Sequence, residues 1–191
     1  RGARGARSQH MRARMPHAAE TKAVQLSACE AHLLAHLGSS GTDEGASNEQ
    51  LIAWIGANCP SFATESSEIA RTAMRCALET ATTDEPPPAT KLTKQIECRK
   101  DLLLKSHVES IRRGKDSLAE LLRMQAASLY EVQAFCGRKG WPAGLIKKIF
   151  YYLYETDLVV TDGFTVWRED VSDETPGKDR ALFQVNEFLQ W

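Results

Sequence analysis

Apolar residues recur every three or four positions along most of this 191-residue chain, and that spacing is typical of amphipathic helices. The run TKAVQLSACEAHLLAHL at 21–37 follows it until GSSGTDEG ends the pattern. The one candidate for a strand is LVVTDGFTV at 158–166, which lies between helical patterns. We therefore predict an all-α fold of about seven or eight helices, arranged as antiparallel helical hairpins stacked in a small solenoid.

Local signals predict where the helices begin and end. Ser47 followed three residues later by Gln50 is a capping-box pattern, which marks a helix start. The three prolines of TTDEPPPAT exclude helix at 86–88. Pro142 fits the first turn of a helix that ends near Glu155. Further helices are expected over about 91–136 with an interruption near Gly114, from about Thr161 through Trp167, and from about Lys178 to the last residue.

Cysteine usage and hydropathy indicate the cellular compartment in which the chain occurs. Its five cysteines are far apart and form no CxxC motif, which indicates reduced, packed thiols and not a disulfide framework. No stretch of about 18 apolar residues occurs, so we expect no membrane-spanning helix and no membrane partner. The N-terminus lacks the apolar core of a signal peptide, and we expect a cytoplasmic protein.

Charge is strongly segregated, although the formal net charge is only −1. Lys and Arg outnumber Asp and Glu by 6 to 1 in 1–22 and by 13 to 6 in 91–150. Acidic residues dominate by 9 to 2 in 23–90 and by 9 to 3 in 151–191. An acidic C-terminal face would attract basic partners. The simpler interpretation is a set of solvated helix faces that differ from segment to segment.

Residues 1–17 are rich in Arg and Gly and almost devoid of large apolar side chains, so they cannot build a core. We expect a tail or linker at 1–17 and a single helical domain at 18–191. The tail is interpreted as a linker or a vector-derived remnant. The alternative is a segment that contacts RNA without sequence preference. Together with the basic block at 91–150, that alternative would make the chain an RNA-binding helical module.

The sequence contains no motif of a nucleotide-binding loop, a nucleophile elbow or an HExxH metal site. The best metal candidate is the set Cys29, His32 and His36, which share one helical face at i, i+3 and i+7. A fourth ligand is not evident, and the neighbouring leucines make an ordinary helix the simpler account. We therefore predict no catalytic residue, no metal and no cofactor, and we expect that the chain is not an enzyme.

The segment IFYYLYETDLVV at 149–160 gathers aromatic and acidic residues. A helical wheel assigns the core stripe of its helix to four residues, Ile146, Ile149, Phe150 and Leu153. Tyr151 and Glu155 point away from that stripe, and Tyr154 lies on its flank. Trp167, on the next expected helix, is predicted to lie in the core.

Two runs carry a family resemblance, LYEVQAFC at 129–136 and FTVWREDVSDETPGKDRALFQVNEFLQW at 164–191. They resemble the C-terminal two-tryptophan (W2-type) HEAT domain shared by translation initiation factor 5, the epsilon subunit of initiation factor 2B and the initiation factor 4 gamma family. The resemblance is strongest over 127–191, and within the 4 gamma family it favours the branch that supports cap-independent initiation. It implies a HEAT-repeat solenoid that acts as an adaptor in translation initiation.

Members of this family take up lysine-rich or helical partner segments on two boxes of aromatic and acidic residues. The resemblance implies that the first box is Tyr151, Tyr154, Glu155, Asp157 and Leu158. It also implies acidic positions at Glu169 and Asp170, and a second box that begins with Glu187, Phe188 and Trp191. The implied partners are the beta subunit of initiation factor 2 and, for some members, a MAP-kinase-interacting kinase. In relatives an acidic tail follows the last tryptophan; the sequence ends at Trp191, so a weaker second box is expected.

The residues themselves leave two points open. Phe188 and Trp191 lie off the apolar stripe of the last helix, where they either pack on a neighbouring helix or complete a partner surface. The domain as a whole either docks basic segments of other proteins, binds RNA, or only spaces its neighbours. We favour the docking of basic segments.

Overall fold

The computed structural model describes residues 18–38, 45–60, 66–103 and 117–190. Within these ranges the chain contains helices and connecting loops and no strand, which confirms the all-α prediction. LVVTDGFTV, the one strand candidate, instead spans a turn and the start of a helix. The helices are α1 (Ala18–His36), α2 (Asn48–Asn58), α3 (Ser66–Thr80), α4 (Ala89–Cys98), α6 (Ser117–Arg138), α7 (Leu145–Glu155), α8 (Thr161–Glu169) and α9 (Lys178–Val185).

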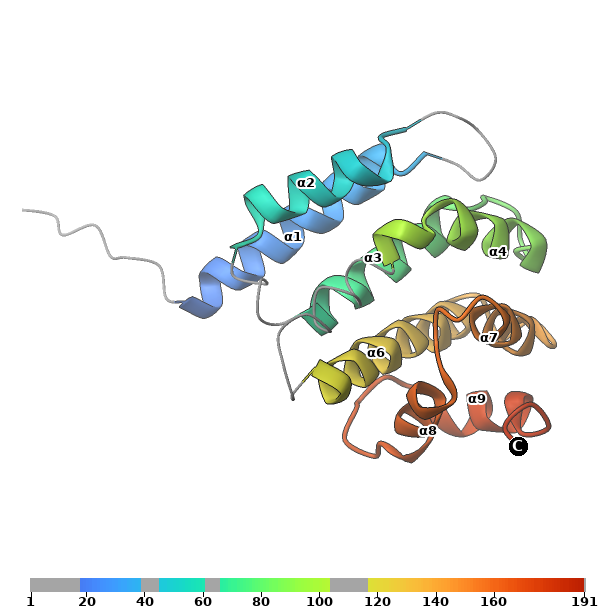
Figure 1. Cartoon of the computed structure of the whole chain (residues 1–191). Coiled ribbons are helices and arrows are strands. Elements are labelled where there is room, and N and C mark those ends of the chain that lie inside the picture. Colours follow the sequence, from blue (N-terminus) through green and yellow to red (C-terminus); the bar gives the residue numbers. More distant parts are fainter. Residues whose placement is uncertain (1–17, 39–44, 61–65, 104–116, 191) are drawn as a thin grey trace, which may run out of the picture.

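The helices lie in successive pairs from the N-terminal to the C-terminal end of the chain (Figure 1). The pair α1 and α2 lies at one end, and α8 and α9 lie at the other. In the middle, α3 packs against α1, α4 and α6, and α6 packs against α3, α7 and α8. This order is consistent with stacked helical hairpins; the HEAT-repeat solenoid itself stays a prediction.

One hydrophobic cluster runs through the described helices, from Cys29 in α1 to Leu189 after α9. Its largest fully buried side chains include four aromatic residues, Trp167, Phe135, Phe150 and Phe164. The prediction that Trp167 lies in the core is confirmed. Its indole Nε1–H donates to Gln133 Oε1 at 3.1 Å, so the one polar atom of the buried ring is satisfied. The division into a tail at 1–17 and a domain at 18–191 stays a prediction.

Two predicted helix signals are confirmed. Ser47 caps α2 through a complete capping box: Gln50 N–H donates to Ser47 Oγ at 3.3 Å, and Ser47 N–H donates to Gln50 Oε1 at 2.9 Å. The three prolines lie between the end of α3 at Thr80 and the start of α4 at Ala89. The start of α2 and the break between α3 and α4 could both be predicted, because capping and proline act on the backbone next to them.

The expected start of α7 at Pro142 is wrong. Gly140 and Trp141 both have positive φ, at 73° and 61°, and the Trp141 N–H donates to Cys136 O at 2.7 Å. These two left-handed residues turn the chain at the end of α6, so the next helix begins only after Gly144. Pro142 lies in the turn and contributes its carbonyl as an acceptor for the Leu145 N–H.

Two further expected helices have different extents. The helical region expected over 91–136 contains α4, which ends at Cys98, and a further helical stretch at 100–103; a break at φ −106° and ψ 12° separates the two at Arg99. Its side chain there donates to the carbonyls of Leu37 and Ala46, which ties α4 to the end of α1. The interruption expected near Gly114 lies outside the described residues. The last helix ends at Val185; Asn186 keeps right-handed helical angles, and a turn follows in which the Leu189 N–H donates to Val185 O at 3.1 Å.

The loop between α8 and α9 is anchored by Arg71 of α3. Its Nε–H donates to Glu131 Oε1 at 2.9 Å, and its other nitrogens donate to Asp173 Oδ2 at 3.0 Å and to Thr175 Oγ1. Glu131 belongs to α6, and the other two acceptors belong to the loop. One guanidinium therefore joins α3, α6 and the segment that leads into α9.

Candidate partner-binding site

Helix α7 is divided along its length into a buried and an exposed side. All four residues of the predicted core stripe, Ile146, Ile149, Phe150 and Leu153, are fully buried. Tyr151 and Tyr154 are 55% and 38% exposed, and Glu155 is exposed as well. The helical wheel is thus confirmed: the same helix supplies the core on one side and two tyrosines to the surface on the other.

The exposed tyrosines meet a phenylalanine that follows α9. The ring centroids of Phe188 lie 6.4 Å from Tyr151, 6.1 Å from Tyr154 and 5.3 Å from the buried Phe164, each in an edge-on arrangement. Edge-to-face packing of this kind is favourable beyond the area it buries. Phe188 therefore packs on the neighbouring helices α7 and α8, and its part in a partner surface stays a prediction.

Two carboxylates lie where α7 ends. Glu155 is its last residue, and Asp157 follows in a left-handed turn at φ 55°. Neither forms an ion pair with any side chain in the described ranges. Glu155 lies against the Tyr151 hydroxyl, and its negative charge raises the pKa of that phenol.

A surface pocket of about 380 Å³ opens beside these carboxylates. It is lined by Tyr154, Glu155, Asp157, Val159, Val160 and Thr161. Its wall combines a tyrosine ring and two valines with two acidic side chains. A long side chain with an apolar stem and a cationic end has the chemistry that such a pocket complements.

The charged residues of α7 lie at the helix ends where the helix macrodipole disfavours them. Lys147 and Lys148 occupy the first turn, and Glu155 is the last residue. The helix macrodipole favours acidic side chains at the N-terminus and basic ones at the C-terminus. This arrangement therefore does not contribute to the stability of α7.

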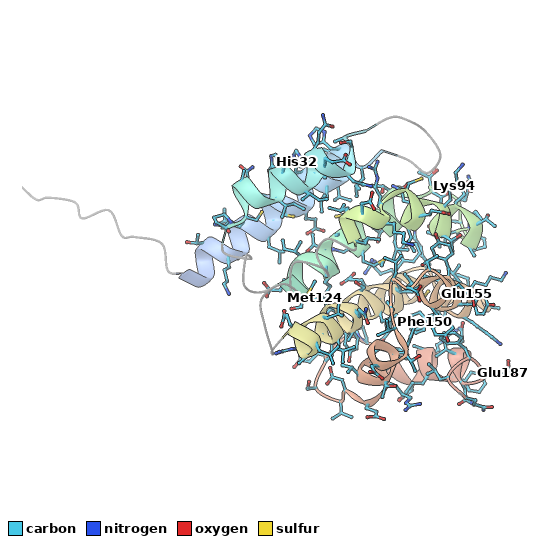
Figure 2. All side chains as sticks on the ribbon, in the orientation of Figure 1. His32, Lys94, Met124, Phe150, Glu155 and Glu187 are labelled. Atoms are coloured by element: carbon cyan, nitrogen blue, oxygen red, sulfur yellow. The ribbon has the colours of Figure 1, made fainter. Side chains whose placement is uncertain are left out.

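Glu187, from the second predicted box, lies beside the opposite end of α7. Lys147 Nζ forms an ion pair with Glu187 Oε2 at 2.6 Å, and this pairing lowers the pKa of the Glu187 carboxyl. Figure 2 shows Glu155 and Glu187 on the same side of the molecule, where α7 and α9 adjoin. We call the surface formed by Tyr151, Tyr154, Glu155, Asp157, Glu187 and Phe188 the acidic/aromatic face.

Three other predicted site positions are not part of this face. Asp170 accepts a hydrogen bond from the Tyr130 hydroxyl at 2.9 Å and from the Ser172 N–H at 2.7 Å, so it orders the loop after α8. Glu169 is exposed and pairs with the adjacent Arg168 at 3.2 Å. Leu158 is 1% exposed and belongs to the core. Trp191 lies outside the described residues.

Sequence reasoning missed several residues of the site. Lys147 is one of them, because nothing in the sequence links it to Glu187, which lies 40 positions away. Val159 and Val160 were read as part of a strand candidate, and the structure places them in the pocket wall. Two features of the sequence could have indicated the pocket: the acidic residues before these valines, and the turn between two helical patterns.

The metal candidate does not assemble. Cys29 is fully buried, whereas His32 stacks flat on Trp54 at 3.9 Å between ring centroids. No group of three or more His, Cys, Asp or Glu side chains within the described ranges is placed to hold a metal ion. The described helices also include none that is long and apolar enough to cross a membrane.

Within the described part of the basic block at 91–150, several side chains are paired with acidic neighbours. Five of its side chains form ion pairs, namely Lys91, Arg123, Arg138, Lys139 and Lys147. Arg99 is 9% exposed and donates to backbone carbonyls. The described part of the block therefore does not present a continuous positive surface of the kind that follows a nucleic-acid backbone.

Comparison with known proteins finds relatives of this chain in one family. Residues 124–191 match the model of the W2 family, described as eIF4-gamma/eIF5/eIF2-epsilon, which confirms the resemblance seen in the sequence. Eukaryotic translation initiation factor 4 gamma 2 of Homo sapiens and of Mus musculus is 37% identical over 68 residues, which are 36% of this chain and 8% of each relative. The chain therefore spans a small part of the length of these relatives.

More distant relatives are similar over a longer stretch. Eukaryotic translation initiation factor 4 gamma 1 of Oryctolagus cuniculus is 29% identical over 149 residues, which are 78% of this chain and 10% of that protein. Eukaryotic translation initiation factor 4 gamma 3 of Homo sapiens is 27% identical over 150 residues, again 78% of this chain. Since 149 exceeds the 68 residues of 124–191, this similarity reaches into the preceding helices.

Proposed function

From the match of residues 124–191 to the W2 family, we propose that this chain is a protein–protein interaction domain of the translation initiation machinery. It docks basic segments of initiation factors on the acidic/aromatic face. The W2 domain of the 4 gamma family is a non-enzymatic adaptor, which agrees with the expectation that the chain is not an enzyme.

One observation carries the proposal. The aromatic rings of the first and second boxes, 34 to 37 residues apart in the chain, contact one another through Phe188 and lie next to the carboxylates of Glu155 and Asp157. Aromatic surface supplies apolar area and cation–π contacts, and the carboxylates attract a cation from a distance. Such docking weakens with salt, because exposed charges are screened over about 8 Å at physiological ionic strength.

The proposed partners follow from the family. W2 domains of the 4 gamma family bind other initiation factors and kinases. For this chain we propose the beta subunit of initiation factor 2 as the principal partner and a MAP-kinase-interacting kinase as a second one. Action in the cytoplasm and in cap-independent initiation belongs to the same proposal, and it is supported by the similarity to 4 gamma 2.

The test is a pull-down from nuclease-treated cell extract. The double reversal Glu155→Lys and Asp157→Lys is compared with a control reversal of two exposed acidic residues outside the face, Asp101→Lys and Glu174→Lys. We expect the first variant to lose the initiation factor 2 beta subunit while the control retains it, with both folded by circular dichroism.

Two other functions give different results in the same experiment. An RNA-binding module retains RNA in both variants when the nuclease is omitted, with steep salt dependence. If the domain only spaces its neighbours, neither the wild type nor either variant captures the beta subunit. Equal capture of the beta subunit by the wild type and by the Glu155/Asp157 reversal would contradict the proposed docking site.

A further inference from the structure

Phe183 projects from the outer side of α9, the last helix of the stack (Figure 1). The helix buries Ala181 and Val185 in the core, whereas Phe183, two positions from each, is 85% exposed. Phe188, after the same helix, packs edge-on against other rings, but Phe183 has no ring contact among the described residues. A whole phenyl ring therefore faces the solvent, where a partner could cover it.

Arg180 lies one helical turn before Phe183, on the same exposed side of α9. Its guanidinium carbon lies 5.7 Å from the ring centroid of Trp141, a distance at which a cation and an indole attract each other. Arg180 forms no ion pair with an acidic side chain in the described ranges. A guanidinium that stacks on a ring keeps a planar fork of N–H donors, which matches the two oxygens of a carboxylate.

Trp141 is held against the start of α9 by two glycines. A Cβ on Gly177, the residue before α9, would overlap Trp141 Cζ2, so the close approach of the indole requires glycine there. A Cβ on Gly137 of α6 would lie 3.6 Å from the same atom, in ordinary van der Waals contact. The indole is thus fixed between α6 and α9 before any partner arrives, and a fixed platform lowers the entropic cost of binding.

The charges near Phe183 indicate which kind of partner fits. Asp179 is next to Arg180 in the sequence but lies about 100° further around the helix. Glu187, one turn after Phe183, is paired with Lys147 at 2.6 Å. Among the described residues, this side of α9 therefore carries a single unpaired cation. A nucleic-acid backbone needs a row of cations, whereas one carboxylate beside an apolar side chain complements this surface.

We propose that Trp141, Arg180 and Phe183 form a second docking surface, the α9 surface, for a protein segment that combines a carboxylate with an aromatic side chain. The Asp or Glu of that segment binds the Arg180 guanidinium, and its aromatic ring packs on Phe183. Residues three apart on a helix have Cβ atoms about 5–6 Å apart, so the two partner residues lie two positions apart in an extended segment. The α9 surface and the acidic/aromatic face therefore select segments of opposite charge.

The test measures the binding of three labelled peptides of equal length to the full chain by fluorescence anisotropy. The first peptide contains Glu and Phe two positions apart among Gly and Ser. The second has Gln in place of Glu, and the third has Ala in place of Phe. We expect the first peptide to bind most tightly, because it alone supplies both the carboxylate and the ring.

Substitutions on the α9 surface should weaken the first peptide selectively. We expect a loss of about fivefold for Phe183→Ala, from the apolar contact, and of about threefold for Arg180→Gln, the size of an exposed ion-pair effect. Val171→Ala removes a side chain that is 98% exposed in the loop after α8 and is the matched apolar control. Lys94→Gln removes an exposed cation on α4 (Figure 2) and is the matched charge control. Both controls should bind the peptide as the wild type does.

The variant Glu155→Gln with Asp157→Asn separates the two surfaces. It should bind the glutamate peptide with unchanged affinity, and only a lysine-containing peptide should be weakened. Loss of the glutamate peptide in this variant would place that peptide on the acidic/aromatic face and overturn the α9 surface. Unchanged binding of the lysine-containing peptide would instead contradict the docking function proposed above and leave the α9 surface intact.

Four other results would overturn the α9 surface. The glutamate and glutamine peptides could bind equally, no peptide could bind, or Phe183→Ala and Arg180→Gln could both retain wild-type affinity. Tighter binding of a single-stranded RNA oligonucleotide that Arg180→Gln weakens would assign the surface to nucleic acid. Concentration-dependent self-association that Phe183→Ala abolishes, followed by ultracentrifugation, would assign it to a second copy of the chain and equally overturn the proposal.

Discussion

The ring of Tyr151 in α7 meets the ring of Phe188 after α9 edge-on, with their centroids 6.4 Å apart. This contact brings together residues of the two boxes that we propose as partner-binding. Substitution of either ring should therefore damage the same partner contact. We expect Tyr151→Ala and Phe188→Ala each to weaken binding of a basic initiation-factor segment several-fold, with a combined effect smaller than the product of the two.

Phe183 provides the matched control for this cycle. It lies on α9, is 85% exposed, and has no ring contact with α7 among the described residues. Phe183→Ala should leave binding unchanged in a titration of the same segment. Strict multiplicativity of the Tyr151 and Phe188 effects would indicate two separate surfaces.

Asp157 combines a functional charge with an unusual backbone. Its φ of 55° lies in the left-handed region, which Asn and Gly adopt with little strain and Ala does not. Asp157→Asn should leave thermal stability nearly unchanged and weaken partner binding through the lost charge. Asp157→Ala should also lower the free energy of unfolding by about 1 kcal/mol. Urea unfolding and peptide titration of both variants separate the two effects, and equal stability of Ala and Asn would show that the turn is unstrained.

Arg71 is expected to stabilise the fold through Glu131. The Glu131 side chain is 6% exposed and pairs with the guanidinium at 2.9 Å, so removal of Arg71 leaves a buried carboxylate without its partner. Arg71→Met should cost about 3 kcal/mol in the free energy of unfolding. The double variant Arg71→Met with Glu131→Leu should recover more than half of that loss, since no buried charge is left alone. Chemical denaturation measures both, and additive losses would contradict the pairing.

The same network predicts a dependence of stability on acid pH. Burial alone would raise the pKa of Asp173, but hydrogen bonds from Thr175 and the charge of Arg71 hold this pKa below its ordinary value of 3.8. A carboxyl with a lowered pKa in the folded state stabilises the fold fully above the pKa of the unfolded chain. That contribution is lost as the pH falls through the lower folded-state pKa. Stability should therefore decline below about pH 4, and Asp173→Asn should make the decline shallower.

Much of the fold could be predicted because its signals are local. The capping box at Ser47 and the three prolines at 86–88 act on the backbone near them, and both set helix boundaries as expected. The core stripe of α7 follows from helical periodicity alone. The start of α7 could not be predicted in the same way, because Trp141 adopts a left-handed conformation that is rare for a bulky residue.

The site could be predicted only in part, for a related reason. A helical wheel predicts that Tyr151 and Glu155 lie outside the core, and their proposed role in partner binding comes from the family resemblance. The ion pair of Lys147 with Glu187 depends on how α7 and the end of α9 pack, and no sequence pattern predicts a contact between positions 40 residues apart. Asp170 is acidic, as the resemblance expects of a binding residue. Its carboxylate instead accepts hydrogen bonds from Tyr130 and Ser172, which fix the loop after α8.

The central claim is that Glu155 and Asp157 attract a basic segment of a partner protein. Its most direct test is a calorimetric titration of a lysine-containing segment of the initiation factor 2 beta subunit into the wild type, into Glu155→Gln with Asp157→Asn, and into the control Asp101→Asn with Glu174→Gln. At low salt, we predict at least a tenfold lower affinity for the first variant, a weaker salt dependence of its binding, and no change for the control. Equal affinity and equal salt dependence of all three proteins would contradict the account.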